Sequence, residues 1–107
     1  MPRWVPRLLS RIHELAGRGQ VRFTLKAIRE LTALGAGLDA QDRCDVLGSL
    51  TADEFAQRFR SESPGEWMYV FKPSLVGTKV YLKLILRAEC LVVFFHEDQG
   101  ESDDEQS

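Results

Sequence analysis

An alternating segment near the C-terminus does most to limit what this chain can fold into. Residues 78–86 carry Val or Leu at every second position, with Lys79, Tyr81, Lys83 and Ile85 in between. Such alternation is typical of a β-strand with one buried face. A tight turn at residues 87–89 and a second apolar run at 89–96 follow, so the sequence predicts an antiparallel hairpin.

The length of that turn decides which side chains share a face of the hairpin. A two-residue turn gives a core face made of Leu82, Leu84, Leu91, Val93 and Phe95. It gives an opposite face made of Lys79, Tyr81, Lys83, Val92, Phe94 and His96. A turn at residues 87–88 places His96 opposite Lys79, whereas one at 88–89 places it opposite Tyr81. A three-residue loop would move His96 to the core face.

The first half of the chain has helical periodicity. From Pro6 to Ala16, apolar residues recur every three or four positions, and Gly17 and Gly19 follow. Thr24 is a suitable cap for a second helix that stops at Gly35. The sequence predicts a third short helix over residues 39–48.

A fourth helix is predicted behind the capping box Thr51–Glu54, because Phe55 and Phe59 are four residues apart. After the Pro-Gly loop at residues 61–66, the aromatic segment Trp67–Phe71 predicts a further strand that ends at Pro73. The predicted fold class is therefore α+β, with short N-terminal helices packed on a small C-terminal antiparallel sheet.

Charge is distributed unevenly along the 107 residues. The last eleven residues hold six acidic side chains and no Lys or Arg, which leaves 14 basic against ten acidic residues in the rest. We therefore predict one domain over residues 1–96 and a disordered acidic tail over 97–107. The excess of basic residues in the domain is mostly arginine, which favours a polyanionic partner.

The sequence also argues against several classes of protein. Cys44 and Cys90 are far apart and lack the spacing of a disulfide framework or a zinc site, which favours a reducing compartment and predicts no metal and no cofactor. The longest apolar run, residues 90–95, is far shorter than the roughly 20 residues of a membrane span. We expect a cytoplasmic protein without a membrane partner.

The polar face of the hairpin suits metal-free RNA cleavage. That reaction needs a base for the 2′-hydroxyl, cations for the developing charge on phosphate and an acid for the leaving oxygen. His96 can exchange a proton near neutral pH, Lys83 supplies charge, and Tyr81 can stack on a base or hold the hydroxyl. The same pattern also fits an ordinary solvated strand face, with Trp67 and Phe71 in the core.

Four islands of sequence carry a resemblance to a known family. They are Gly19-Gln-Val-Arg22, Asp45-Val-Leu-Gly-Ser-Leu-Thr51 with Asp53-Glu-Phe55, Trp67 with Tyr69-Val-Phe-Lys-Pro73, and Leu75-Val76 with Lys79-Val-Tyr-Leu-Lys83. In this order and spacing they resemble the motility quorum-sensing regulator (MqsR) family of type II toxin–antitoxin toxins. The match covers about residues 8–96.

This resemblance implies a RelE-like fold and an mRNA interferase that cleaves GCU-type sites without the ribosome. It also implies mRNA as substrate and a cognate antitoxin as partner. The active-site tyrosine of the family falls on Tyr81. Three other family positions differ: a lysine falls near Gln57, a glutamine falls on Met68, and the lysine that ends the last strand is His96 here.

Arg58 or Arg60 is a candidate to replace the missing lysine charge. We assign catalysis to Tyr81, His96, Lys83 and Arg58, and RNA binding to Lys72, Lys79, Arg60 and Gln57. The alternative function is a catalytically weak or inactive module that binds RNA or protein on the same scaffold, which the changes at Gln57 and Met68 favour. A purely structural interaction domain would leave the polar hairpin face without a role.

Overall fold

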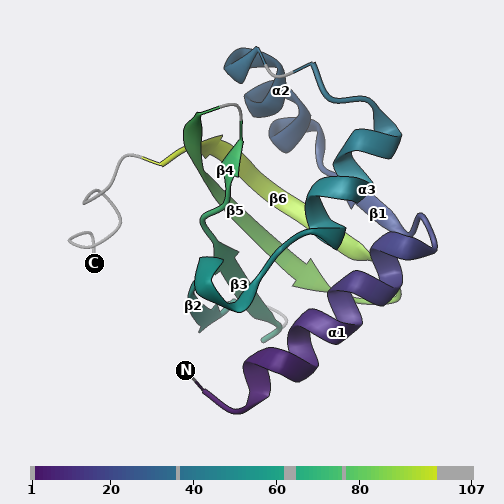
Figure 1. Cartoon of the computed structure of the whole chain (residues 1–107), viewed down its shortest axis with the longest axis vertical. Coiled ribbons are helices and arrows are strands. Elements are labelled where there is room, and N and C mark those ends of the chain that lie inside the picture. Colours follow the sequence, from purple (N-terminus) through teal and green to yellow (C-terminus); the bar gives the residue numbers. More distant parts are fainter. Residues whose placement is uncertain (1, 36, 62–64, 76, 99–107) are drawn as a thin grey trace.

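Three α-helices and six strands make up the described part of the chain, which a computed structural model defines at residues 2–35, 37–61, 65–75 and 77–98 (Figure 1). The helical elements are α1 (Trp4–Gly17), α2 (Leu25–Leu34), α3 (Ala40–Gly48) and the single 3₁₀ turn η1 (Ala52–Glu54). The strands are β1 (Val21–Phe23), β2 (Phe55–Arg60), β3 (Trp67–Phe71), β4 (Ser74–Leu75), β5 (Thr78–Leu86) and β6 (Cys90–Glu97). The predicted α+β class is confirmed.

The helix ends follow local capping chemistry. The Thr24 hydroxyl accepts a hydrogen bond from the Ala27 amide at 3.1 Å, and Gly35 ends α2 with a φ of 72°. A reciprocal capping box, in which Asp39 and Asp42 each bond to the other's backbone, begins α3. Three of the four predicted helices are therefore confirmed, with α1 beginning two residues before Pro6.

The predicted fourth helix is wrong. Its capping box forms, since Glu54 accepts a hydrogen bond from the Thr51 amide at 2.9 Å, but it supports only η1. From Phe55 the chain continues as strand β2, paired antiparallel to β3 with a bulge between Phe55 and Gln57. The bulge places Phe55 and Phe59 on opposite faces of the sheet, whereas a helix would have put them together. Pairing with β3 overrides the local helical signal.

The sheet has the strand order β1-β6-β5-β3-β2, and β4 pairs with the start of β5. The prediction of a purely antiparallel sheet is wrong in one respect, because β1 is parallel to β6. The Gln20 carbonyl accepts a hydrogen bond from the Cys90 amide at 3.0 Å. The Thr24 amide donates one to the Val92 carbonyl, also at 3.0 Å. The extended segment between α1 and α2 thus covers the first part of the β6 edge, at Cys90–Val92.

The hairpin between β5 and β6 combines features of the predicted alternatives. Leu86 pairs with Cys90, so the loop has three residues and not two. A bulge at Val93 then shifts the register, and beyond it Tyr81 lies opposite His96, as a turn at residues 88–89 had predicted. Between the loop and the bulge, the residues of β6 that face the core are the ones predicted for the opposite face. Val92 is therefore part of the core and Leu91 lies on the other face, contrary to prediction.

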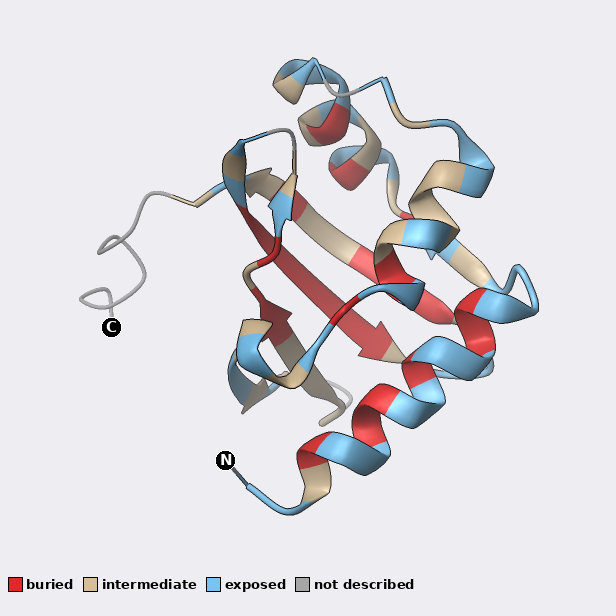
Figure 2. Ribbon diagram, viewed as in Figure 1, coloured by how far each residue is buried: buried red, intermediate tan, exposed pale blue. Residues whose placement is uncertain are grey.

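The helices pack on one face of this sheet, which we call the helix face. The core there joins apolar residues of all three helices to alternate residues of the strands, including Val80, Leu82, Leu84 and Phe95. Figure 1 shows α1 and α3 on the near side of the sheet, and Figure 2 shows burial concentrated along β5 and one side of α1. Among the described helices, none is long and apolar enough to cross a lipid bilayer.

Candidate active site

The opposite side of the sheet, which we call the tyrosine face, has a second group of buried residues outside that core: Val70, Tyr81, Lys83, Ile85 and Leu91. Tyr81 alternates with Val80 and Leu82 along β5, so its ring points away from the helices. The rings of Tyr81 and His96 are nearly parallel, at 5° and 5.1 Å between centroids. The register therefore places a phenol against an imidazole, as one of the two predicted two-residue turns, at residues 88–89, had implied.

The histidine has a defined orientation. Its Nδ1 lies 3.0 Å from the Glu97 carbonyl oxygen. A carbonyl can only accept, so Nδ1 donates and, in the neutral imidazole, Nε2 keeps the lone pair. His96 is half-buried and lines a hollow with Glu30, Ala33, Leu34 and Glu97. The lone pair of Nε2 can thus accept a proton, and the hollow leaves space beside the ring for a substrate group.

Lys83 is the one charged residue that is buried within the described ranges. Its ammonium lies 4.2 Å from the centroid of Phe94, 4.6 Å from that of Phe59 and 6.0 Å from that of Tyr81. Burial, with a smaller contribution from the charge of Lys26, lowers the pKa of Lys83. A cation in this partly dry position acts more strongly on a nearby phosphate than a solvated one does.

Helix α2 contributes a further cation to the tyrosine face. Lys26 lies 3.9 Å from the Phe94 centroid and forms an ion pair with Glu30. Glu30 also accepts a hydrogen bond from the Phe95 amide at 2.8 Å, where β1 no longer covers the edge of β6. Burial alone would raise the pKa of Glu30, but the bonds from Lys26 and Phe95 outweigh it and the pKa is lowered. An ionised Glu30 thus anchors Lys26 beside the site.

Lys72 lies on the other flank of the tyrosine ring. Its ammonium is 5.9 Å from the Tyr81 centroid and 3.4 Å from Oδ1 of Asp98. That oxygen is buried and has no hydrogen-bond partner among the described residues, so its contact with Lys72 is an ion pair without hydrogen-bond geometry. The backbone amide of Asp98 donates a hydrogen bond to the backbone carbonyl of Lys79 at 2.8 Å. Asp98, together with Glu97 in β6, thus extends the fold past the predicted boundary at residue 96; residues 99–107 of the predicted tail lie outside the described residues.

We expect Asp98→Asn to lower the free energy of unfolding by about 1–2 kcal/mol, because the ion pair between the half-buried Lys72 and the buried carboxylate oxygen of Asp98 is lost. Chemical denaturation measures this. Glu97→Gln is the matched control, since Glu97 is exposed and its side chain forms no ion pair with another described residue. Equal stabilities for the two variants would show that the Lys72–Asp98 pair contributes nothing.

The remaining predicted site residues divide between the two faces. Gln57 pairs with Val70, which pairs with Lys83, so Gln57 lies on the tyrosine face, exposed at its edge. Lys79 is exposed on the same face. Arg58 pairs with Tyr69 and so lies on the helix face. Arg60 shares that orientation, because side chains alternate along β2.

Arg58 and Arg60 are therefore not part of the group around Tyr81, contrary to the idea that one of them replaces a missing lysine there. The physical reason is the alternation of side chains in a strand, which the helix prediction for this segment had concealed. Sequence reasoning also missed Lys26, Phe59 and Asp98. Lys26 is brought in by the packing of α2 on β6, and no local pattern signals that contact.

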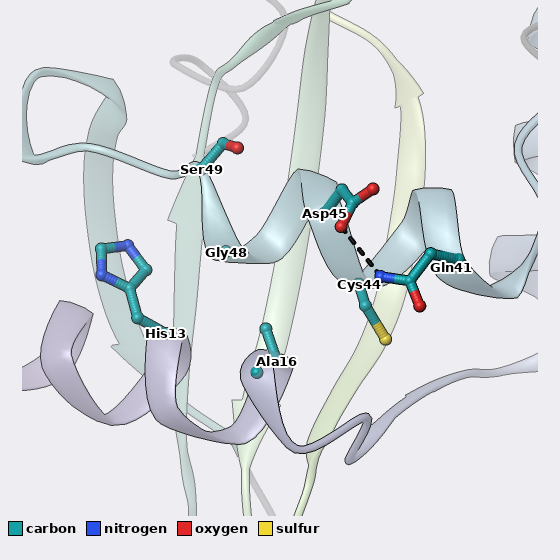
Figure 3. A pocket seen from close by; sticks show the side chains of 8 residues that line it. His13, Ala16, Gln41, Cys44, Asp45, Gly48 and Ser49 are labelled. Carbon is teal, nitrogen blue, oxygen red and sulfur yellow. Dashed lines mark hydrogen bonds between the residues drawn. The ribbon is translucent and has the colours of Figure 1, made fainter.

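A second hollow, of about 380 Å³, lies between α1 and α3 on the helix side (Figure 3). His13 and Cys44 stand at opposite ends of it, so they do not form a nucleophile–base pair. The His13 ring nitrogen Nε2 is 2.8 Å from the Leu50 carbonyl oxygen, a structural hydrogen bond. Burial raises the pKa of the Cys90 thiol to about 12, although Arg11 opposes this, and so Cys90 is not a nucleophile either.

The tyrosine face therefore remains the candidate active site. In the ranges that the structure describes, no three His, Cys, Asp or Glu side chains are grouped to hold a metal ion. The site has instead three lysines, Lys26, Lys72 and Lys83, around stacked aromatic rings. Cations next to ring faces are what a protein uses to hold the phosphates and bases of a single-stranded nucleic acid. Fold and site together define a small α+β domain whose sheet carries a candidate nucleic-acid-binding face.

Comparison with known proteins gives the particular family. The chain matches the family described as "Motility quorum-sensing regulator, toxin of MqsA" over residues 6–97. It is 36% identical over 90 residues to the mRNA interferase toxin MqsR of Escherichia coli (strain K12), an alignment that covers 83% of this chain and 90% of that protein. The chain belongs to the motility quorum-sensing regulator family of toxins, which confirms the resemblance found in its sequence.

Proposed function

We propose that this protein is the toxin of a type II toxin–antitoxin system and cleaves mRNA as an endoribonuclease. The observation that carries the proposal is the stack of Tyr81 on His96 with the ammonium of Lys83 buried at 6.0 Å from the tyrosine centroid. The similarity to a protein named mRNA interferase toxin supports it.

Cleavage proceeds through attack of a 2′-hydroxyl on the adjacent phosphorus. Nε2 of His96 accepts the hydroxyl proton, and the oxygen forms a bond to phosphorus as the bond to the 5′-oxygen breaks. Lys83 and Lys72 stabilise the negative charge that builds on the phosphate oxygens, a role for which no divalent ion is needed. Tyr81 stacks on or holds the nucleotide that carries the hydroxyl. Lys83 then gives a proton from its ammonium to the leaving 5′-oxygen, an acid role that its lowered pKa favours.

The partners in this proposal are mRNA and a cognate antitoxin protein, and the place of action is the cytoplasm, where mRNA is found. Preference for GCU-type sites and the RelE-like classification of the fold belong to the same proposal and rest on the family resemblance. The family description "toxin of MqsA" supports an antitoxin partner. Lys79 and Gln57, exposed at the borders of the tyrosine face, are the proposed outer RNA contacts.

A second function is favoured by one observation. Met68 pairs with Phe59 and Ile85 on the tyrosine face, where the resembling family carries a glutamine. An apolar side chain there leaves fewer hydrogen bonds to substrate. This favours a catalytically weak or inactive module that binds RNA or a protein partner on the same scaffold.

We expect the purified protein to cleave a defined RNA containing GCU in the presence of EDTA, and to leave 2′,3′-cyclic phosphate and 5′-hydroxyl ends. The ends follow from attack by the 2′-hydroxyl, and mass spectrometry of the fragments identifies them. Tyr81→Phe, prepared in parallel, should lose most of the activity, which excludes a contaminating nuclease. Activity only with an added divalent ion would contradict the metal-independent reaction, and binding without cleavage would favour the second function.

A further inference from the structure

The two arginines of β2 form a separate stack on the helix face. The guanidinium of Arg58 lies between two indoles, 4.1 Å from the centroid of Trp4 and 3.9 Å from that of Trp67. Arg60 also lies over Trp67, at 4.6 Å. We call Trp4, Arg58, Trp67 and Arg60 the arginine–tryptophan stack. It joins the start of α1 to the open edge of the sheet, where β2 is the last strand.

The charges of this stack are not neutralised within the described part of the chain. Arg11, Arg18, Arg22 and Arg87 each form an ion pair with a glutamate there. Arg58 and Arg60 are exposed, and neither has a carboxylate within ion-pair distance among the described residues. The acid next to Trp67 in sequence, Glu66, is already held by Arg87 through two hydrogen bonds of 2.9 and 2.8 Å.

A guanidinium stacked on an aromatic ring uses its face and keeps its N–H edges for other groups. Those edges form paired hydrogen bonds with phosphate oxygens, and stacking holds the group in place so that less side-chain freedom is lost on binding. Trp67 is itself only partly buried, and Arg58 and Arg60 both lie over its ring. Paired N–H forks on the edge strand of the sheet that carries the candidate active site favour single-stranded RNA over an acidic peptide.

The position of the stack connects it to the candidate active site. Phe59, between the two arginines on β2, points to the tyrosine face and contacts Lys83 at 4.6 Å. Strands in a sheet are about 4.8 Å apart, so the edge of β2 lies roughly 10 Å from β5, which carries Lys83 and Tyr81. An RNA strand held at Tyr81 reaches this edge within a few nucleotides.

We infer that the arginine–tryptophan stack is a second RNA contact, which binds phosphates of the substrate beyond the scissile nucleotide after the strand has crossed the β2 edge. The inference rests on the proposed function, since it takes RNA as the substrate. It assigns Arg58 and Arg60 to binding and not to chemistry. Arg3 and Arg7, exposed on either side of Trp4 in sequence, extend the positive charge along α1.

The test measures binding without cleavage. Oligoribonucleotides of 4 and 16 nucleotides with the same central GCU are made fully 2′-O-methylated, which removes the attacking hydroxyl. Dissociation constants are measured between 50 and 200 mM salt for the full chain, for R58Q/R60Q, for R60Q alone and for Arg18→Gln. Arg18 is the matched control, because it is exposed and paired with Glu14.

We expect R58Q/R60Q to bind the 16-mer at least about tenfold more weakly, since two charge-assisted contacts are lost. The slope of log affinity against log salt should fall by about 0.7 for each lost phosphate contact. Binding of the 4-mer and the behaviour of Arg18→Gln should match the wild type. R60Q should show part of the effect with an unchanged melting temperature, because Arg60 does not contact α1 in the stack.

Wild-type affinity and salt slope in R58Q/R60Q would overturn the inference. If the melting temperature alone falls, the stack only fastens α1 to the sheet. If RNA binding is kept but complex formation with the cognate antitoxin is lost, the surface belongs to the protein partner. If the variants bind RNA as expected but the wild-type protein cleaves no RNA, the proposed function is refuted. The assignment of the arginine–tryptophan stack as an RNA contact is then still supported.

Discussion

Replacing Lys83 by methionine is expected to make the protein more stable and at the same time to reduce RNA cleavage by about 10²-fold or more. The lowered pKa of Lys83 shows that the folded protein disfavours its charged form, chiefly through burial. Methionine has a similar length and no charge to desolvate, so we expect the free energy of unfolding to rise by about 1 kcal/mol. Loss of one preorganised charge at a reacting phosphate typically reduces the rate by 10²–10³-fold.

The lowered pKa of Lys83 also predicts how the stability gain of Lys83→Met depends on pH. Between the lowered pKa of Lys83 and its ordinary value of 10.5, the unfolded chain binds more protons than the folded one. The stability contribution of Lys83 therefore rises with pH through that interval. The advantage of Lys83→Met over the wild type should be largest at neutral pH and should shrink as the pH approaches 10.5.

Chemical denaturation at several pH values, beside a cleavage assay, measures both effects. Lys79→Met is the control: Lys79 lies on the same face but is exposed, so its loss should change stability little and cleavage only modestly. A less stable Lys83→Met would mean that the contacts of the ammonium with Phe59 and Phe94 outweigh its desolvation. A stable variant with wild-type cleavage would remove Lys83 from the site.

Sequence alone predicted three helices and the strands β3, β5 and β6 because each has a strong local signal: a cap, a glycine at positive φ or period-two alternation. It also predicted that Tyr81 and His96 share a face. The reason given was incomplete, because the loop has three residues and the bulge at Val93 restores the parity. A bulge depends on packing at both sides of a strand, which one strand's pattern does not reveal.

The position of the arginines of β2 could not be predicted from the sequence either. The segment Phe55–Arg60 has helical spacing of its aromatics, and only the pairing with β3 makes it a strand. Once it is a strand, neighbouring residues point to opposite faces, and Arg58 moves away from Tyr81. Nothing local could have predicted this, since the deciding partner, Trp67, lies across a loop and contributes through a tertiary stack.

The second large effect is expected at His96, where the resembling family has lysine. His96→Ala should reduce the cleavage rate by about 10²-fold or more with little change in RNA affinity, because proton transfer by a positioned group contributes 10²–10⁴-fold. In His96→Lys, which restores the residue of the resembling family, activity should be partly kept, because lysine also carries a group that can transfer a proton.

A structural role of the same ring must be separated from catalysis, because His96 stacks on Tyr81 at 5.1 Å. His96→Phe keeps an aromatic ring for that stack but has no titratable nitrogen. If His96 is the base, His96→Phe and His96→Ala lose cleavage equally, and only His96→Ala loses the stacking contribution of roughly 1 kcal/mol to stability. Cleavage rescued in His96→Phe would mean that the imidazole only supports Tyr81. The base would then have to be found among the neighbours of the tyrosine, with Lys72 and Lys83 the nearest cations.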